Sequence, residues 1–292
     1  MLPAPPEDWV MAVLKGYLDD SGDEFLPAMS VAGYVGNIAA WTKFEEEWQA
    51  ALDLAEIPYF HMKEISDPSK PMHKFYGAKN SEASFQLLSN LVRAIGASAY
   101  PSRMSFMAVG SVVSRDALAR FNRERNRGLE ALPLALFTCL GLIQTHYPGK
   151  TVEVLLDGVV KAESKIATAK GYLATSARDF SKRDDVAVIP AKGELNTKTV
   201  KGLQAADFAA YEAFRKFERL EPFFKSVDLS HVQSNAEYLY QYEGWLDDTK
   251  RAFPDARKSL TALGDATNFR CPIWTYEVLC DEDETRNGIW QD

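Results

Sequence analysis

Three aspartates stand at positions where a carboxylate suggests chemistry. Asp19 closes an apolar stretch that begins near residue 12, and Asp157 closes a second apolar stretch. Asp207 lies on the apolar stripe of a predicted helix, where an ionised carboxylate is costly unless a cation or strong donors receive it. In α/β proteins, ligands gather at strand ends, where side chains from separate elements converge. Carboxylates that converge in one cleft repel each other unless a proton or a cation bridges them.

Such a set of oxygen ligands suits Mg²⁺ or Mn²⁺. Two of these ions about 3.5–4 Å apart can activate a water and stabilise the leaving oxygen of a phosphodiester. The pattern therefore predicts a Mg²⁺- or Mn²⁺-dependent nuclease or phosphodiesterase. Each aspartate also has a simpler interpretation, because Asp19 and Asp157 stand in turn-forming sequences and Asp207 could pair with a lysine or an arginine.

The elements that would position these residues follow from the spacing of apolar side chains. Short runs rich in β-branched and aromatic residues predict strands at 12–19, 28–36, 104–113, 152–157 and 186–190. Spacings of three and four predict helices at 41–55, 81–97, 130–146, 162–179 and 200–217, and residues 59–77 are expected to form a loop. A hairpin followed by alternating helices and strands is typical of an α/β protein with a mixed sheet flanked by helices.

The chain is predicted to have three parts. Residues 1–10 form a short disordered lead-in without the pattern of a signal peptide, and residues 11–220 form the core. Residues 221–292 form a C-terminal helical extension packed on the core, with helices near 235–252 and 255–263 and a last strand at 273–279.

Composition excludes several classes of protein. Of 292 residues 46% are hydrophobic, which is enough for a core, and no apolar run reaches the length of a membrane span. Three cysteines without a Cys-x-x-Cys pair argue against a disulfide scaffold and a structural zinc, and a cytoplasmic location is the expectation. The net charge of −8 means that any nucleic acid would be bound through local basic patches or metal ions.

Several short motifs together resemble a bacterial and phage family of unknown function. Its members open with Asp-Glu-Ser-Gly and close with Leu-Gln-Leu-Ala-Asp. The matching stretches here are Tyr-Leu-Asp-Asp-Ser-Gly-Asp at 17–23, Val-Ala-Gly-Tyr-Val at 31–35, Phe-His-Met-Lys-Glu at 60–64, Leu-Leu-Asp at 155–157 and Leu-Gln-Ala-Ala-Asp at 203–207. That family is similar to ribonuclease H-like folds, so the resemblance implies a ribonuclease H-like core and a metal-dependent nuclease acting on DNA or RNA.

The resemblance also implies roles for individual residues. Asp19 would bridge the metal ions, Asp157 would be the second ligand, and Asp207 would be the ligand from the last core helix. Glu64 would be a fourth carboxylate. His61, three residues before Glu64, would act as a base, a donor or a ligand, or would simply be a packed or surface histidine.

Two residues are expected to support this site. Asp20 stands where the family has a glutamate, and its side chain is one methylene shorter. Gln204 shares a helical face with Asp207, so it would bind a ligand or orient that aspartate. Ala205 replaces a leucine of the family, which alters packing but not chemistry.

Basic side chains are candidates for phosphate contacts, with solvated faces and ordinary ion pairs as the alternative. The candidates are Arg115, Arg120, Arg123, Lys198 and Lys201.

Two other functions compete with a nuclease. The first is a catalytically inactive ribonuclease H-like module that binds nucleic acid or a partner protein in phage defence or in a mobile element. The second is a phosphatase with an aspartyl nucleophile, which usually needs a carboxylate two residues after the nucleophile. Ser21 occupies that place after Asp19.

Overall fold

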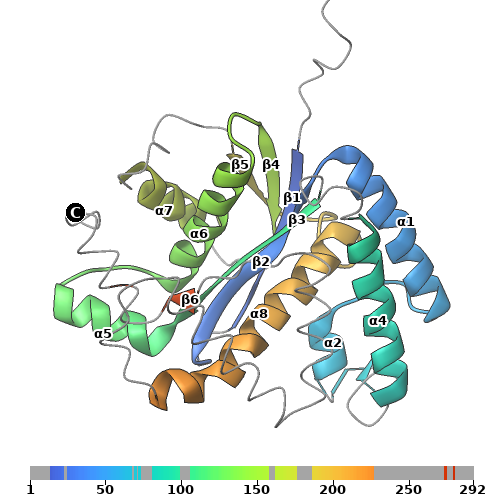
Figure 1. Ribbon diagram of the computed structural model, residues 1–292, viewed down its shortest axis with the longest axis horizontal. Coiled ribbons are helices and arrows are strands. Elements are labelled where there is room, and N and C mark those ends of the chain that lie inside the picture. Colours follow the sequence, from blue (N-terminus) through green and yellow to red (C-terminus); the bar gives the residue numbers. More distant parts are fainter. Residues whose placement is uncertain are drawn as a thin grey trace, which may run out of the picture.

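A computed structural model describes residues 14–22, 25–67, 69–70, 72–73, 81–98, 106–157, 162–175, 186–226, 273–274 and 279. At its centre lies a six-stranded sheet with the strand order β5-β4-β1-β2-β3-β6 (Figure 1). The strands are β1 (Leu14–Ser21), β2 (Ala28–Gly36), β3 (Phe106–Ser114), β4 (Val152–Leu156), β5 (Val186–Pro190) and β6 (Ile273–Trp274). The predicted α/β class is confirmed, and the predicted strands are present with ends shifted by a few residues.

The sheet is mixed, as predicted. β2 runs antiparallel to both of its neighbours, β1 and β3. β4 runs parallel to β1, β5 runs parallel to β4, and β6 runs parallel to β3. The carboxyl ends of β1, β4 and β5 consequently lie at one edge of the sheet, where side chains from separate strands can meet.

Helices cover both faces of the sheet (Figure 1). One face carries α1 (Ile38–Leu54), α4 (Ser81–Ser98) and α8 (Lys201–Ser226), and the other carries α6 (Ala131–His146) and α7 (Ala162–Thr175). Because side chains alternate along a strand, each face has its own core. In β2, for example, Val31 and Val35 pack in the core under α6, while Ala32 and Tyr34 pack in the core under α8.

α8 can approach the sheet closely because its inner face is made of small residues. Ala205, Ala209 and Ala213 are fully buried there. At Gly202 an added Cβ would lie 2.3 Å from the ring of Tyr17 in β1, so only glycine permits this approach. The sequence thereby holds the helix directly over β1.

Two short helices were not expected from the sequence. α2 (Met62–Ser66) lies within the predicted loop at 59–77. α5 (Arg115–Arg125) forms from the basic segment, where the Ser114 side chain accepts a hydrogen bond from the Ala117 N–H at 3.4 Å and caps the helix. Leu118 and Phe121 of α5 are buried, so the segment has an apolar side that its arginines conceal in the sequence.

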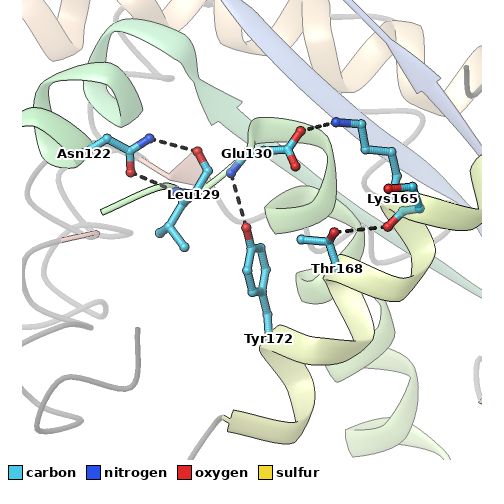
Figure 2. A network of polar contacts seen from close by, with 7 residues as sticks. Asn122, Leu129, Glu130, Lys165, Thr168 and Tyr172 are labelled. Atoms are coloured by element: carbon cyan, nitrogen blue, oxygen red, sulfur yellow. Dashed lines mark hydrogen bonds and ion pairs between the residues drawn. The ribbon is translucent and has the colours of Figure 1, made fainter. Parts of the chain in front are cut away.

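Polar contacts join α5, α6 and α7 (Figure 2). The amide group of Asn122 bonds both backbone groups of Leu129, with Nδ2 donating at 2.8 Å and Oδ1 accepting at 3.1 Å. The next residue, Glu130, donates its N–H to the hydroxyl of Tyr172 and pairs with Lys165 of α7. This network fixes the chain at the start of α6.

Several predictions lie outside the described residues. They are the lead-in at 1–10, the helices near 235–252 and 255–263, and the last four residues of the helix predicted at 162–179. Within the described part, α8 continues past residue 220 to Ser226, and Ile273–Trp274 pairs with β3 as part of the predicted last strand. No helix in these described ranges combines the length and apolarity needed to span a membrane.

Candidate metal centre

Asp19 and Asp157 lie side by side, directly after the last paired residues of the parallel strands β1 and β4. Asp19 does not end its strand as predicted, because β1 continues to Ser21 in its pairing with β2. Leu18 of β1 is in register with Leu156 of β4, and the Asp157 N–H donates to the Leu18 carbonyl at 3.0 Å. Paired strands lie about 4.7–4.9 Å apart. Leu18 and Leu156 both face the α6 core, so the alternation of side chains turns Asp19 and Asp157 toward α8.

α8 brings Asp207 to the same end of β1. Gly202 lies against Tyr17 of β1, and the Ser30 hydroxyl of β2 donates to the Ala210 carbonyl at 2.8 Å. Asp207 lies on α8 between these two contacts. Its Oδ2 accepts the N–H of Met62 at 2.6 Å, which orients the carboxylate. The three predicted aspartates are thus brought together from three elements.

The electrostatics of the site show how closely the carboxylates interact. Burial raises the pKa of Asp19 well above its usual value, and the charges of Asp207, Asp20 and Asp157 raise it further. Burial also raises the pKa of Asp207, against the opposing effects of His61 and of the hydrogen bond from Met62. The negative charges of the cluster therefore act on one another over short distances.

Asp20 belongs to the same cluster. Burial raises its pKa to about 6, with further contributions from the charges of Asp157 and Asp207. Its own N–H donates to Oδ1 of Asp19 at 2.8 Å, so the backbone of Asp20 holds the Asp19 carboxylate. Four carboxylates therefore interact at this end of the sheet.

Neighbouring residues orient the cluster. Thr197 donates both its N–H, at 2.9 Å, and its hydroxyl, at 2.5 Å, to Oδ2 of Asp157. Oε1 of the buried Gln204 accepts hydrogen bonds from Nε1 of Trp48 at 2.9 Å and from the N–H of Phe60 at 3.0 Å. Gln204 consequently ties α8 to α1 and to the segment that leads into α2, whose first residue, Met62, supplies the contact to Asp207.

The two other predicted site residues lie differently. His61 is close enough to Asp207 to lower its pKa, and Nδ1 of His61 is enclosed without a hydrogen-bond partner in the part of the chain that the structure describes. Glu64 accepts the hydroxyl of Tyr59 at 2.8 Å and does not contribute to the raised pKa of Asp19, Asp20 or Asp207. The structure thus brings His61 to the cluster and directs Glu64 to Tyr59.

The predicted phosphate contacts fall into two groups. Arg115, Arg120 and Arg123 lie on α5, where Arg120 forms an exposed ion pair with Glu124 at 3.0 Å. Lys198 and Lys201 flank the start of α8, next to Thr197 and its bond to Asp157. Only the second group adjoins the carboxylates through a described contact.

The carboxylates suit a hard cation by their chemistry. They offer oxygen ligands, and a divalent cation would relieve the mutual repulsion that raises the pKa of Asp19. As they stand, no three His, Cys, Asp or Glu side chains within the described ranges are arranged to hold a metal ion. The donor set fits Mg²⁺ or Mn²⁺ in kind, and binding would require the side chains to turn toward a common point.

Sequence reasoning missed the residues that orient the cluster. Thr197 and Trp48 act through contacts that span 40 and 156 positions of the chain, so no local pattern marks them.

Comparison of the chain with family models, with curated proteins and with solved structures finds no match.

Proposed function

We propose that this protein is a metal-dependent nuclease with a ribonuclease H-like core and that it hydrolyses phosphodiester bonds in DNA or RNA. In the strand order β5-β4-β1-β2-β3, the strands β1, β3, β4 and β5 run in one direction and β2 runs antiparallel to them. This arrangement supports the proposed fold. The short motifs that resemble a family with an expected nuclease site include the residues of the carboxylate cluster.

The observation that carries the proposal is the convergence of Asp19, Asp157 and Asp207. The strand pair β1–β4 and the helix α8 bring three carboxylates together. Burial raises the pKa of Asp19 and of Asp207, and the charges of their carboxylate neighbours raise both further. The opposing charge that acts on Asp207 comes from His61, so no lysine or arginine of the described chain contributes to lowering the pKa of this aspartate. Buried carboxylates that repel one another are costly, which favours a functional role for this cluster.

Each residue would have a defined task. Asp19, Asp157 and Asp207 would hold the cations, while Thr197 and Met62 orient the carboxylates of Asp157 and Asp207 by their N–H groups. A bound pair of Mg²⁺ or Mn²⁺ ions would supply an activated water and neutralise the leaving oxygen. His61 would hold or release a proton beside Asp207.

A catalytically inactive module that binds nucleic acid or a partner protein is the second candidate. It is favoured by the absence, among the described residues, of three side chains already arranged to hold a metal ion. It would keep the fold and the binding surface, so Asp157→Asn would leave binding and the biological phenotype unchanged.

The proposal is tested by incubating the purified protein with labelled single-stranded DNA, duplex DNA, RNA and a DNA–RNA hybrid in Mn²⁺, Mg²⁺ or EDTA. We expect cleavage of at least one substrate with Mn²⁺ and none with EDTA. Asp19→Asn should abolish cleavage, while Asp116→Asn, at an exposed aspartate of α5, should not. Intact substrates under every condition would contradict the proposal.

A further inference from the structure

Two chain segments flank the carboxylate cluster, and each is fixed to one of its members. The segment before α8 is held at Thr197, whose N–H and hydroxyl donate to Asp157. The segment that leads into α2 is held at the first residue of that helix, Met62, whose N–H donates to Asp207. Any side chain that joins these segments therefore has a defined position relative to the cluster.

The segments meet at Lys198 and Tyr59. Nζ of Lys198 lies 5.2 Å from the centre of the Tyr59 ring, a distance typical of a cation–π contact. The backbone of Lys198 is also fixed, since its N–H donates to Oδ1 of Asn196 at 2.9 Å. The Tyr59 hydroxyl donates to Oε1 of Glu64 at 2.8 Å, which orients the ring.

Lys198 differs from other lysines of this region in having no carboxylate partner. Lys192 pairs with Glu163 and Lys165 pairs with Glu130, whereas no acidic side chain of the described residues lies within ion-pair distance of Lys198. The Lys198 side chain is exposed, and its residue follows directly after the one that holds Asp157. An exposed ammonium group in this place is available to an anion that reaches the carboxylates.

We propose that Lys198 binds a backbone phosphate of the nucleic acid next to the bond that is cleaved, and that Glu64 is a positioning residue which acts through Tyr59. This inference rests on the proposed nuclease function and assigns a substrate contact to the same site. It gives Glu64 a role different from that of a fourth metal ligand. The Tyr59 ring positions the Lys198 side chain next to the cluster through the cation–π contact. The carboxylate of Glu64 orients that ring by accepting its hydroxyl.

The phosphate contact is tested by the salt dependence of binding. The probe is a fluorescent single-stranded oligonucleotide, with Ca²⁺ replacing Mn²⁺, titrated at several NaCl concentrations. The logarithm of the association constant falls linearly with the logarithm of the salt concentration. Loss of one phosphate contact makes this slope less steep by about 0.7 for a single strand. We expect Lys198→Ala to show this change and a several-fold weaker affinity, and Lys198→Arg to retain most of both. Lys170→Ala, at an exposed lysine of α7, is the control.

The role of Glu64 is tested with two variants. Glu64→Gln keeps an oxygen that accepts the Tyr59 hydroxyl, so oligonucleotide binding should stay near the wild-type value. Glu64→Ala removes that acceptor and should reproduce part of the Lys198→Ala effect. Both variants should bind Mn²⁺ as the wild type does, which calorimetry would measure.

The outcomes separate this inference from the nuclease proposal. If the wild type binds and cleaves the oligonucleotide and Lys198→Ala behaves identically, only the phosphate contact is overturned. If Glu64→Gln loses Mn²⁺ affinity as fully as Glu64→Ala, Glu64 is a ligand and its positioning role is overturned. If the wild type neither binds nor cleaves, both proposals fall.

Discussion

Asp19 is buried two residues before the end of β1, and three neighbouring carboxylates add to the effect of burial on its pKa. At neutral pH this arrangement stores electrostatic repulsion in the folded protein, and unfolding releases it. Residues placed for metal binding are often destabilising in this way, because the site is built for a charge that the protein itself does not supply.

The first residue-scale prediction concerns the stability of the metal-free protein. Asp19→Asn removes one of the repelling charges but keeps the size of the side chain. We expect it to raise the free energy of unfolding at pH 7 in EDTA, because a buried charge that its neighbours repel is removed. Denaturant unfolding would measure this, and Asp116→Asn should have almost no effect. A destabilised Asp19→Asn protein would contradict the repulsion.

The second prediction concerns how the stability of the metal-free protein and its affinity for Mn²⁺ depend on pH. The pKa of Asp20 rises from 3.8 to about 6 on folding, so between these values the folded state binds more protons than the unfolded state. Stability of the metal-free protein should therefore fall as pH rises from about 4 to 7. Mn²⁺ competes with protons for the same carboxylates, so its affinity should rise over this range. Thermal unfolding at several pH values, with and without Mn²⁺, would check both trends.

At the scale of elements, the segment before α8 holds the Asp157 carboxylate. Thr197→Val removes the hydroxyl donor but keeps the N–H donor and the shape of the side chain. We expect roughly 10–100-fold loss of metal affinity or cleavage, as is usual when a residue that orients a ligand is removed. Thr145→Val, at an exposed threonine of α6, should leave both unchanged. An equal effect of the two changes would indicate that Thr197 does not orient Asp157.

α8 carries Asp207, and its distance from β1 depends on Gly202. In Gly202→Ala the new methyl group would lie 2.3 Å from the Tyr17 ring, so either α8 or the ring must move. We expect a loss of about 1–3 kcal/mol in stability and a marked loss of cleavage. Gly141→Ala, in α6 where the added atom meets nothing within 4 Å, should be neutral or stabilising. The two variants therefore separate helix propensity from the position of α8.

The strands and long helices could be predicted from the sequence because their apolar spacing is regular. The same reasoning led to Asp19, Asp157 and Asp207, since strand ends and a polar residue on an apolar stripe are visible in the pattern. The contact of Glu64 with Tyr59 could not be predicted, because a nearby carboxylate in a motif does not reveal which way its side chain turns. α5 was missed since its arginines hide the buried Leu118 and Phe121.

The whole molecule carries a net charge of −8, whereas the proposed substrate is a polyanion. A protein of this charge repels nucleic acid at long range, so a divalent cation and local groups such as Lys198 must provide the attraction. The fold contributes by bringing one strand pair, one helix and two flanking segments to the same edge of the sheet.

The most direct test of the central claim is a calorimetric titration of Mn²⁺ into the metal-free protein at pH 7. The wild type should bind Mn²⁺, and Asp19→Asn, Asp157→Asn and Asp207→Asn should each weaken binding by tenfold or more, while Asp116→Asn binds as the wild type. Absence of binding by the wild type, or equal binding by all the variants, would contradict the claim that these three carboxylates form a metal site.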